Sequence, residues 1–144
     1  MLFRMDKNKI YITVTALFLL YLLTVLFFCL YNFTNNNINL AEYFFGIRLD
    51  RVFHFLMFLP YPFVCWLFFN YNKYIKIFKE YTFAAIILSG ILFASMAEAS
   101  QELLTTYRDS DPYDLGANLT GIMVGCLIAY ILRKPLKKIC NFLL

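Results

Sequence analysis

Charged residues are scarce in this chain, and four long stretches contain almost none. Only 15% of the residues are Asp, Glu, Lys or Arg, whereas 62% are hydrophobic and the mean hydropathy is +0.66. Water-soluble domains carry about 45–50% apolar residues, so this composition excludes an ordinary soluble domain. The apolar stretches are continuous rather than alternating, which favours membrane-spanning helices over the strands of a transmembrane barrel.

Cysteine and histidine are also few, and their spacing excludes several kinds of site. The 4 cysteines show no C-x-x-C spacing, so neither a disulfide framework nor a thiol relay is indicated. The chain has 1 histidine, His54. Any metal would therefore be held mostly by oxygen ligands, and would be Mg²⁺, Mn²⁺ or Ca²⁺ rather than a structural Zn²⁺. The sequence assigns no metal ligand and no cofactor.

Four charge-poor runs are long enough, or nearly so, to cross a hydrocarbon core as helices of about 20 residues. They predict an all-α fold, a four-helix transmembrane bundle in a single domain over residues 1–144. The predicted spans are residues 10–33, 52–72, 81–98 and 115–132. The third is slightly short, so we expect Glu98 at or just inside a membrane boundary. No small-x-small cleavage site follows the first run, which we interpret as a retained span.

Lysine and arginine gather on one predicted side of the membrane. The two termini and the linker between the second and third spans carry 10 of the 13 basic residues, and only Arg48, Arg51 and Arg108 fall in the other loops. Because basic loops stay inside, this pattern predicts a multi-pass protein of the inner (plasma) membrane with both termini cytoplasmic. The inner basic residues suit contact with anionic membrane lipids, and no nucleic-acid partner is expected.

Polar residues interrupt the apolar sequence near the predicted outer ends of spans two, three and four. In each span two of them lie three or four residues apart, which places that pair on one helical face, whereas Arg51 is adjacent to Asp50 and Arg108 lies in the loop between spans three and four. Ionisable groups in a membrane cost about 2.5–3.5 kcal/mol each, so they usually face the bundle interior and pair with one another. We therefore expect these residues to converge on one polar site: Asp50, Arg51, His54, Glu98, Gln101, Arg108, Asp114 and Asn118.

Each of these residues also has a structural interpretation. The carboxylates that open helices, Asp50 and Asp114, are favoured there by capping and by the helix dipole. His54 is open to three interpretations: an interior hydrogen-bonded residue, an acid or base, or a metal ligand. The arginines could contact lipid phosphates, and the two amides could join helices by hydrogen bonds.

Proline and glycine are few, and their positions predict two features of the bundle. Pro60 and Pro62 remove backbone donors in the second span, so we expect a kink or break there. Gly121 and Gly125 lie four residues apart in the fourth span, a spacing typical of close contact between two membrane helices.

The polar residues also form an ordered pattern. It reads Asp50-Arg51-x-x-His54-Phe55, then Glu98-x-x-Gln101, then Arg108 followed by Asp114, Asn118 and Gly121, within residues 50–125. This pattern resembles that of the VanZ-like membrane proteins of bacteria. That family usually shows Asp-Lys where this chain has Asp50-Arg51, and its loop before the arginine is one residue shorter and contains Pro-Gly. The founding member of the family is associated with low-level resistance to the glycopeptide teicoplanin.

Together these observations predict an outward-facing pocket that binds or acts on an anionic cell-envelope or lipid-linked molecule, by hydrolysis or group transfer if it is an enzyme. In this interpretation, acid and base groups supply proton transfer, whereas cations and amides hold the substrate. Two alternatives stay open. The polar set could be an interhelical clamp in a non-enzymatic envelope-binding or assembly factor, or the protein could be a transporter, which would need an ionisable group near the membrane midplane. The predicted catalytic residues are Asp50, His54, Glu98 and Asp114, and the predicted substrate-binding residues are Arg51, Gln101, Arg108 and Asn118.

Overall fold

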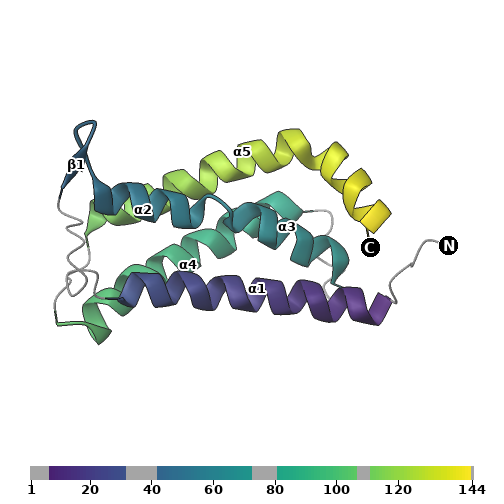
Figure 1. Cartoon of the computed structure of the whole chain (residues 1–144), viewed down its shortest axis with the longest axis horizontal. Helices are drawn as coiled ribbons and strands as arrows, with labels where there is room; N and C mark the ends of the chain where they lie inside the picture. The colour runs from purple at the N-terminus through teal and green to yellow at the C-terminus, as the bar shows by residue number, and fades with distance from the viewer. Residues whose placement is uncertain (1–6, 32–41, 73–80, 107–110, 144) are drawn as a thin grey trace.

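The computed structural model describes residues 7–31, 42–72, 81–106 and 111–143, and nearly all of them are helical (Figure 1). Within these ranges, 4 helices are long and apolar enough to cross a membrane, as predicted. One of them is built from two shorter helices, α2 and α3, in succession. The helices are α1 (Lys7–Leu30), α2 (Leu49–Phe58), α3 (Tyr61–Tyr71), α4 (Thr82–Leu104) and α5 (Pro112–Leu143).

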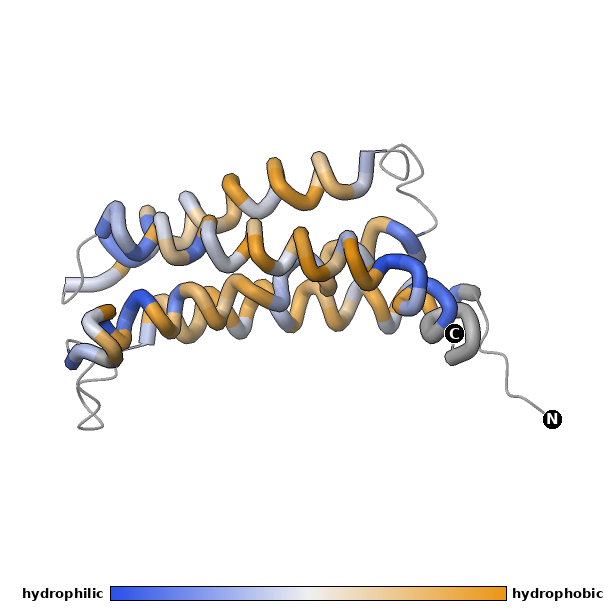
Figure 2. Tube along the Cα trace, turned by 90° about the horizontal axis from the view of Figure 1, so that it is seen from above, coloured by the Kyte–Doolittle hydropathy of each residue, from blue (hydrophilic) through white to orange (hydrophobic). Residues whose placement is uncertain are grey.

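The two ends of the bundle differ in what they carry. The beginning of α1 and the end of α5 lie at one end, which we call the terminal end (Figure 1). The beginnings of α2 and α5 and the end of α4 lie at the other, which we call the hairpin end. Hydrophilic residues gather at both ends and the middle is predominantly apolar (Figure 2). This distribution is what a bundle needs when lipid surrounds its middle and water its ends.

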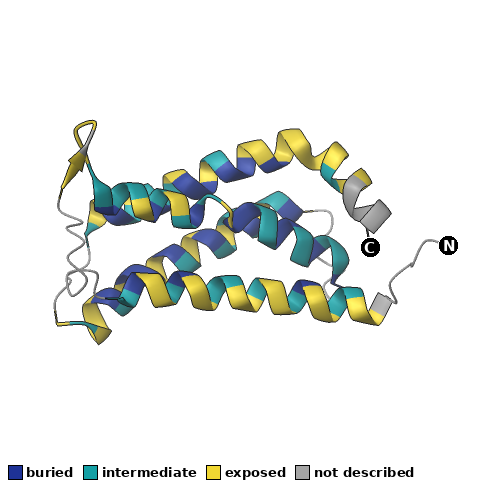
Figure 3. Cartoon of the chain, viewed as in Figure 1, coloured by how far each residue is buried: buried dark blue, intermediate teal, exposed yellow. Residues whose placement is uncertain are grey.

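The outer surface of the bundle is apolar rather than polar. Only 17% to 39% of the most apolar window of each candidate span is buried inside the protein. Large aliphatic side chains, including Leu23, Leu92 and Leu127, are more than half exposed. Figure 3 shows exposed positions along the outward faces of the helices and buried positions where the helices meet. An exposed apolar surface of this extent is stable when lipid covers it.

The predicted break in the second span is present between α2 and α3. A turn at Leu59 and Pro60 separates the two helices. Because Pro60 and Pro62 have no N–H, the regular helical hydrogen bonds cannot continue through this segment. The hydroxyl of Tyr21, from α1, donates to the Met57 carbonyl beside the break. The proline prediction is therefore confirmed, and a neighbouring helix supplies a donor next to the interruption.

The predicted close contact of the glycines is also present, and its partner is α2. A Cβ atom added to Gly121 would lie 2.5 Å from the carbonyl oxygen of Phe55, and one added to Gly125 would clash with the carbonyl oxygen of Leu59. Only glycine lets the two backbones approach this closely. The contact therefore runs from the second turn of α2 to the turn before α3, and it holds α5 close to the second span just beyond the polar residues.

One element departs from the all-α prediction. A short hairpin precedes α2, formed by β1 (Tyr43–Phe44) and β2 (Ile47–Arg48) in an antiparallel pair. Its turn residues, Phe45 and Gly46, have φ values of 51° and 79°. Positive φ at both central residues suits the two-residue turns that match the twist of a hairpin. Strands of two residues are too short to leave a periodic pattern in the sequence, which is why they were not predicted.

The helices also extend beyond several predicted spans. The third continues six residues past its predicted end, so Glu98 lies within α4. Its predicted place at a membrane boundary stays a prediction. The fourth begins at Pro112 and the second at Leu49, each three residues earlier than predicted. The predicted end of the first span, at residue 33, lies outside the described residues. A charged residue marks the end of an apolar run in the sequence, but the helix can continue past it, because glutamate and glutamine are good helix formers.

Candidate functional site

His54 is at the centre of a buried polar cluster at the hairpin end. Its Nδ1 atom lies 3.0 Å from Oδ1 of Asn118 on α5, and the Nδ2 of Asn118 donates to Oε1 of Glu98 on α4 at 2.7 Å. The residues His54, Asn118 and Glu98 are all buried. Three helices that are far apart in the sequence thus meet through one chain of hydrogen bonds.

This chain of hydrogen bonds fixes which nitrogen of His54 carries a proton. The Glu98 carboxylate accepts from the amide nitrogen of Asn118, so the amide oxygen of Asn118 faces the imidazole. An oxygen can only accept, and Nδ1 of His54 must therefore be the N–H donor. The second ring nitrogen, Nε2, is then the atom available for a proton or a metal ion.

Two carboxylates face Nε2. It lies 3.8 Å from Oδ1 of Asp50, one turn earlier on α2, and 3.8 Å from Oδ2 of Asp114 in the first turn of α5. Both aspartates are buried, and one ligand atom from each of the three residues lies within 4.8 Å of the others. Within the described part of the chain, Asp50, His54 and Asp114 are the group that could hold a metal ion.

Two arginines lie beside this cluster, nearer to the surface. Arg48 NH2 lies 3.6 Å from Asp50 Oδ2, and Arg51 Nε lies 3.9 Å from Asp114 Oδ1. Both arginines also approach Oδ2 of Asp111, at 3.6 and 3.7 Å. Their side chains are 33% and 29% exposed, against 5% to 8% for Asp50 and Asp114. The arginines therefore form the mouth of the site, and the carboxylates and imidazole form its floor.

Ion pairs surround the cluster. Among the described residues, the guanidinium groups of Arg48 and Arg51 approach the carboxylates of Asp50, Asp111 and Asp114. The imidazole of His54 lies near the carboxylates of Asp50, Glu98 and Asp114. Buried charges are costly unless they are balanced, so these contacts are needed for the acids to stay ionised.

The predicted site residues are not all brought together. Asp50, Arg51, His54, Glu98, Asp114 and Asn118 form the cluster described above. Gln101 is buried, but its amide donates to the Cys29 carbonyl of α1 at 2.9 Å. This contact fits the interpretation of Gln101 as a link between helices, and its substrate-binding role stays a prediction. Arg108 lies outside the described residues.

Sequence reasoning missed Arg48 and Asp111. Arg48 is brought to Asp50 by the unpredicted hairpin, and its position two residues before an aspartate is the only local signal. Asp111 precedes Pro112, and its Oδ1 accepts from the N–H of Tyr113 at 2.8 Å. An aspartate followed by proline is a signature of the start of a helix. Asp111 therefore caps α5, and Asp114 lies in the first turn, where the helix dipole favours a carboxylate.

The hairpin end can thus bind cations at its floor and anions at its mouth, in a setting shielded from water by three helices. No family model, no curated protein and no solved structure matches this chain.

Proposed function

We propose that this is an integral membrane protein whose hairpin end faces outward and binds, or acts on, the anionic group of a cell-envelope or lipid-linked molecule. The observation that carries the proposal is a fully buried histidine flanked by two buried aspartates, with two arginines above them. Clusters of ionisable groups at membrane depth are rarely without a functional reason, because each group is costly to insert.

The orientation is supported by the charges of the two ends. Among the described residues, Arg48 and Arg51 lie at the hairpin end, and Arg133, Lys134 and Lys137 of α5 lie at the terminal end. In the sequence, 10 of the 13 basic residues fall in the termini and the linker between α3 and α4. The positive-inside rule therefore directs the terminal end to the cytoplasm and the hairpin end outward. An outward site has direct access to envelope precursors and to the outer lipid leaflet.

Binding would begin at the mouth of the site. The guanidinium groups of Arg48 and Arg51 suit a phosphate or carboxylate, because their planar donors match paired oxygens. Tyr113 lies under Arg51, with the guanidinium carbon 4.4 Å from the ring centroid, and this contact restrains the side chain. His54 and its flanking carboxylates would then lie below the bound group, where they could transfer a proton in hydrolysis or group transfer.

The resemblance to VanZ-like proteins suggests the cellular consequence. If the bound molecule is an envelope precursor, its modification or sequestration would lower susceptibility to teicoplanin. This part of the proposal rests on the resemblance of the motifs.

Cells that express the protein provide the test. Teicoplanin susceptibility and envelope lipids would be compared for the wild type, His54→Ala and Arg51→Ala, with folded yield measured by size-exclusion chromatography in detergent. We expect the wild type to protect and both variants to lose protection while keeping their yield. Glu102→Gln is the matched control, because Glu102 is an exposed acid on α4 at the same end. Equal protection by all variants would show that the cluster has no role in teicoplanin susceptibility.

The second candidate is an interhelical clamp. The contacts among His54, Asn118 and Glu98 join α2, α5 and α4 directly, as a clamp requires. A clamp loses folding when one member is removed, since a buried partner is left unsatisfied. Normal yield of Glu98→Gln with a lost phenotype would favour the site, and lost yield would favour the clamp. The third interpretation, a transporter, needs an ionisable group near the membrane midplane. His54 and Glu98 each lie about halfway between the middle of their span and its hairpin end.

A further inference from the structure

We propose that Asp50, His54 and Asp114 bind a divalent cation of the Mn²⁺ or Mg²⁺ class at the floor of the site. The first argument is the ligand set. One imidazole nitrogen and two carboxylate oxygens converge from α2 and α5, all from buried side chains. Carboxylates favour Mg²⁺ and Mn²⁺, and the single imidazole shifts the preference toward Mn²⁺.

The second argument is the proton on His54. Asn118 requires Nδ1 to carry the N–H, so the lone pair of Nε2 in the neutral ring points toward Asp50 and Asp114. A proton on Nε2 or a cation between the three groups makes this arrangement favourable. Metal-binding histidines show this same arrangement, in which the other nitrogen donates to a group that is itself held by a hydrogen bond. Here that group is Asn118, and Glu98 holds it.

The third argument is size. Ligand atoms that share one cation lie about 3.0–3.5 Å apart when each is about 2.1 Å from it. The 3.8 Å distances from Nε2 to the two aspartates are only slightly longer, so small side-chain rotations would complete the set.

The cation would help the site to bind the anionic ligand of the proposed function, and in this respect the inference rests on that function. A pocket whose floor is carboxylate repels an anionic ligand, whereas a bound Mn²⁺ between Asp50 and Asp114 would attract one. Arg48 and Arg51 would hold the same ligand from above. The cation site can nevertheless exist without that ligand, and it is measured separately.

The experiment is Mn²⁺ binding to the purified full-length protein in detergent, followed by electron paramagnetic resonance. We expect one Mn²⁺ per chain and a rise in the melting temperature when Mn²⁺ is added. Asp114→Asn should weaken binding at least about tenfold, since it removes a ligand charge. Glu102→Gln, which changes an exposed acid, should bind as the wild type does. Size-exclusion profiles check that each variant is folded.

Failure to bind Mn²⁺ in the wild type would overturn the cation site, whatever the variants do. Equal binding by the wild type and Asp114→Asn would also overturn it, and if that variant does not fold, Asp50→Asn serves in its place. Both results leave the teicoplanin assay unaffected, so failure of the cation site and failure of the proposed function are distinguishable.

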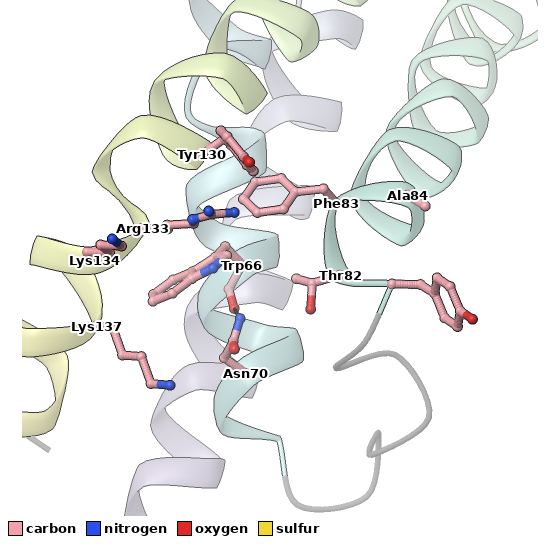
Figure 4. Close-up of a pocket in the computed structure, with 10 residues that line it drawn as sticks. Trp66, Asn70, Thr82, Phe83, Ala84, Tyr130, Arg133, Lys134 and Lys137 are labelled. Atoms are coloured by element: carbon pink, nitrogen blue, oxygen red, sulfur yellow. Dashed lines mark hydrogen bonds between the residues drawn. The ribbon is translucent and has the colours of Figure 1, made fainter.

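A separate observation at the terminal end carries a second inference. A groove of about 630 Å³ lies between α3, the beginning of α4 and α5 (Figure 4). Its walls include the aromatic rings of Trp66, Phe83 and Tyr130, and three cations line it: Arg133, Lys134 and Lys137. Within the described ranges, none of these three cations forms an ion pair with a carboxylate. Arg133 instead stacks on Tyr130, with its guanidinium carbon 3.9 Å from the ring centroid.

We infer that this groove holds the headgroup of an anionic phospholipid. Cations at the membrane boundary attract anionic lipids, and the aromatic walls suit the junction between headgroup and acyl chain. The positive-inside rule is enough to explain why basic residues lie at the terminal end. It does not explain why three of them line one groove that has an aromatic wall. The groove is independent of the site at the hairpin end.

Trp66 provides the measurement, because it is the 1 tryptophan of the chain and lies in the groove wall. Its fluorescence would be recorded in vesicles that contain brominated phosphatidylglycerol or brominated phosphatidylcholine. We expect stronger quenching by the anionic lipid in the wild type, and loss of this preference in Arg133→Ala/Lys137→Ala. The control is Lys138→Ala, which changes an exposed cation outside the groove lining.

Equal quenching by both lipids in the wild type would contradict the lipid site, as would a preference that the double variant keeps. Inorganic phosphate is added in a further arm. If millimolar phosphate abolishes the preference, the groove is a site for soluble phosphate and the lipid assignment is wrong.

Discussion

The two ends of the bundle hold charge in opposite ways. At the hairpin end, the side chains of Asp50, Glu98 and Asp114 are buried and contact cations or His54. At the terminal end, Arg133 and Lys137 line an open groove with no carboxylate partner among the described residues. The acids are fixed by three helices, whereas the cations project from one helix.

This difference follows from where each charge can reach water or lipid phosphate. Long side chains such as those of Arg133 and Lys137 place their charge at the membrane surface while their stems lie along apolar sequence. Short carboxylates on buried helical faces cannot do so, and they must be balanced within the protein. Substitutions at the hairpin end should therefore change stability far more than those at the terminal end.

The largest effect is expected where α5 contacts α2. Gly121→Ala would place a methyl group 2.5 Å from the Phe55 carbonyl oxygen, so the helices must separate near the cluster. We expect a loss of about 1–3 kcal/mol or more in the free energy of unfolding. Gly116→Ala is the control on the same helix, because nothing lies within 4 Å of its added Cβ and alanine favours helix. Thermal unfolding in detergent compares the two, and equal melting temperatures would mean that the helices are not in contact.

An effect of comparable size is expected at the amide that joins His54 to Glu98. Asn118→Leu keeps a similar volume but removes both hydrogen bonds from buried partners. Leaving such groups unsatisfied costs about 1–3 kcal/mol each.

At the terminal end, Lys134→Ala should change stability by no more than about 0.5 kcal/mol, because the side chain is exposed and forms no ion pair among the described residues. Chemical or thermal unfolding measures the loss of stability in both variants. Similar losses would contradict the difference between the two ends of the bundle.

At the hairpin end, the smallest effect is expected at the mouth of the site. Arg48→Gln removes ion pairs of 3.6 Å to Asp50 and Asp111 from a side chain that is 33% exposed. Exposed ion pairs contribute about 0–1 kcal/mol, and salt screens them. We expect a loss of less than about 1 kcal/mol that shrinks as salt is added. A salt-independent loss of several kcal/mol would place Arg48 with the buried floor rather than at the mouth.

The arrangement of the helices was predictable because lipid imposes simple rules on sequence. Long apolar runs had to be helices, the prolines at 60 and 62 had to interrupt one, and Gly121 with Gly125 had to contact a neighbour. Spacing of three and four residues correctly placed Asp50 with His54 and Asp114 with Asn118 on shared faces. These inferences depend only on periodicity and backbone chemistry.

The finer details of the site could not be predicted because they depend on contacts distant in the sequence. The hairpin that brings Arg48 to Asp50 has strands of two residues and no periodic signal. Gln101 shares a helical face with Glu98, but its amide contacts α1. The direction of the Asn118 amide, which determines the proton on His54, is set by Glu98 on another helix.

A crystal structure of the protein grown with Mn²⁺, with anomalous scattering recorded from the metal, would test the central claim most directly. We predict one anomalous peak between Nε2 of His54 and the carboxylates of Asp50 and Asp114, at about 2.0–2.4 Å from each ligand atom. Crystals in which these three side chains point away from one another, or in which they converge with no metal between them, would contradict the account.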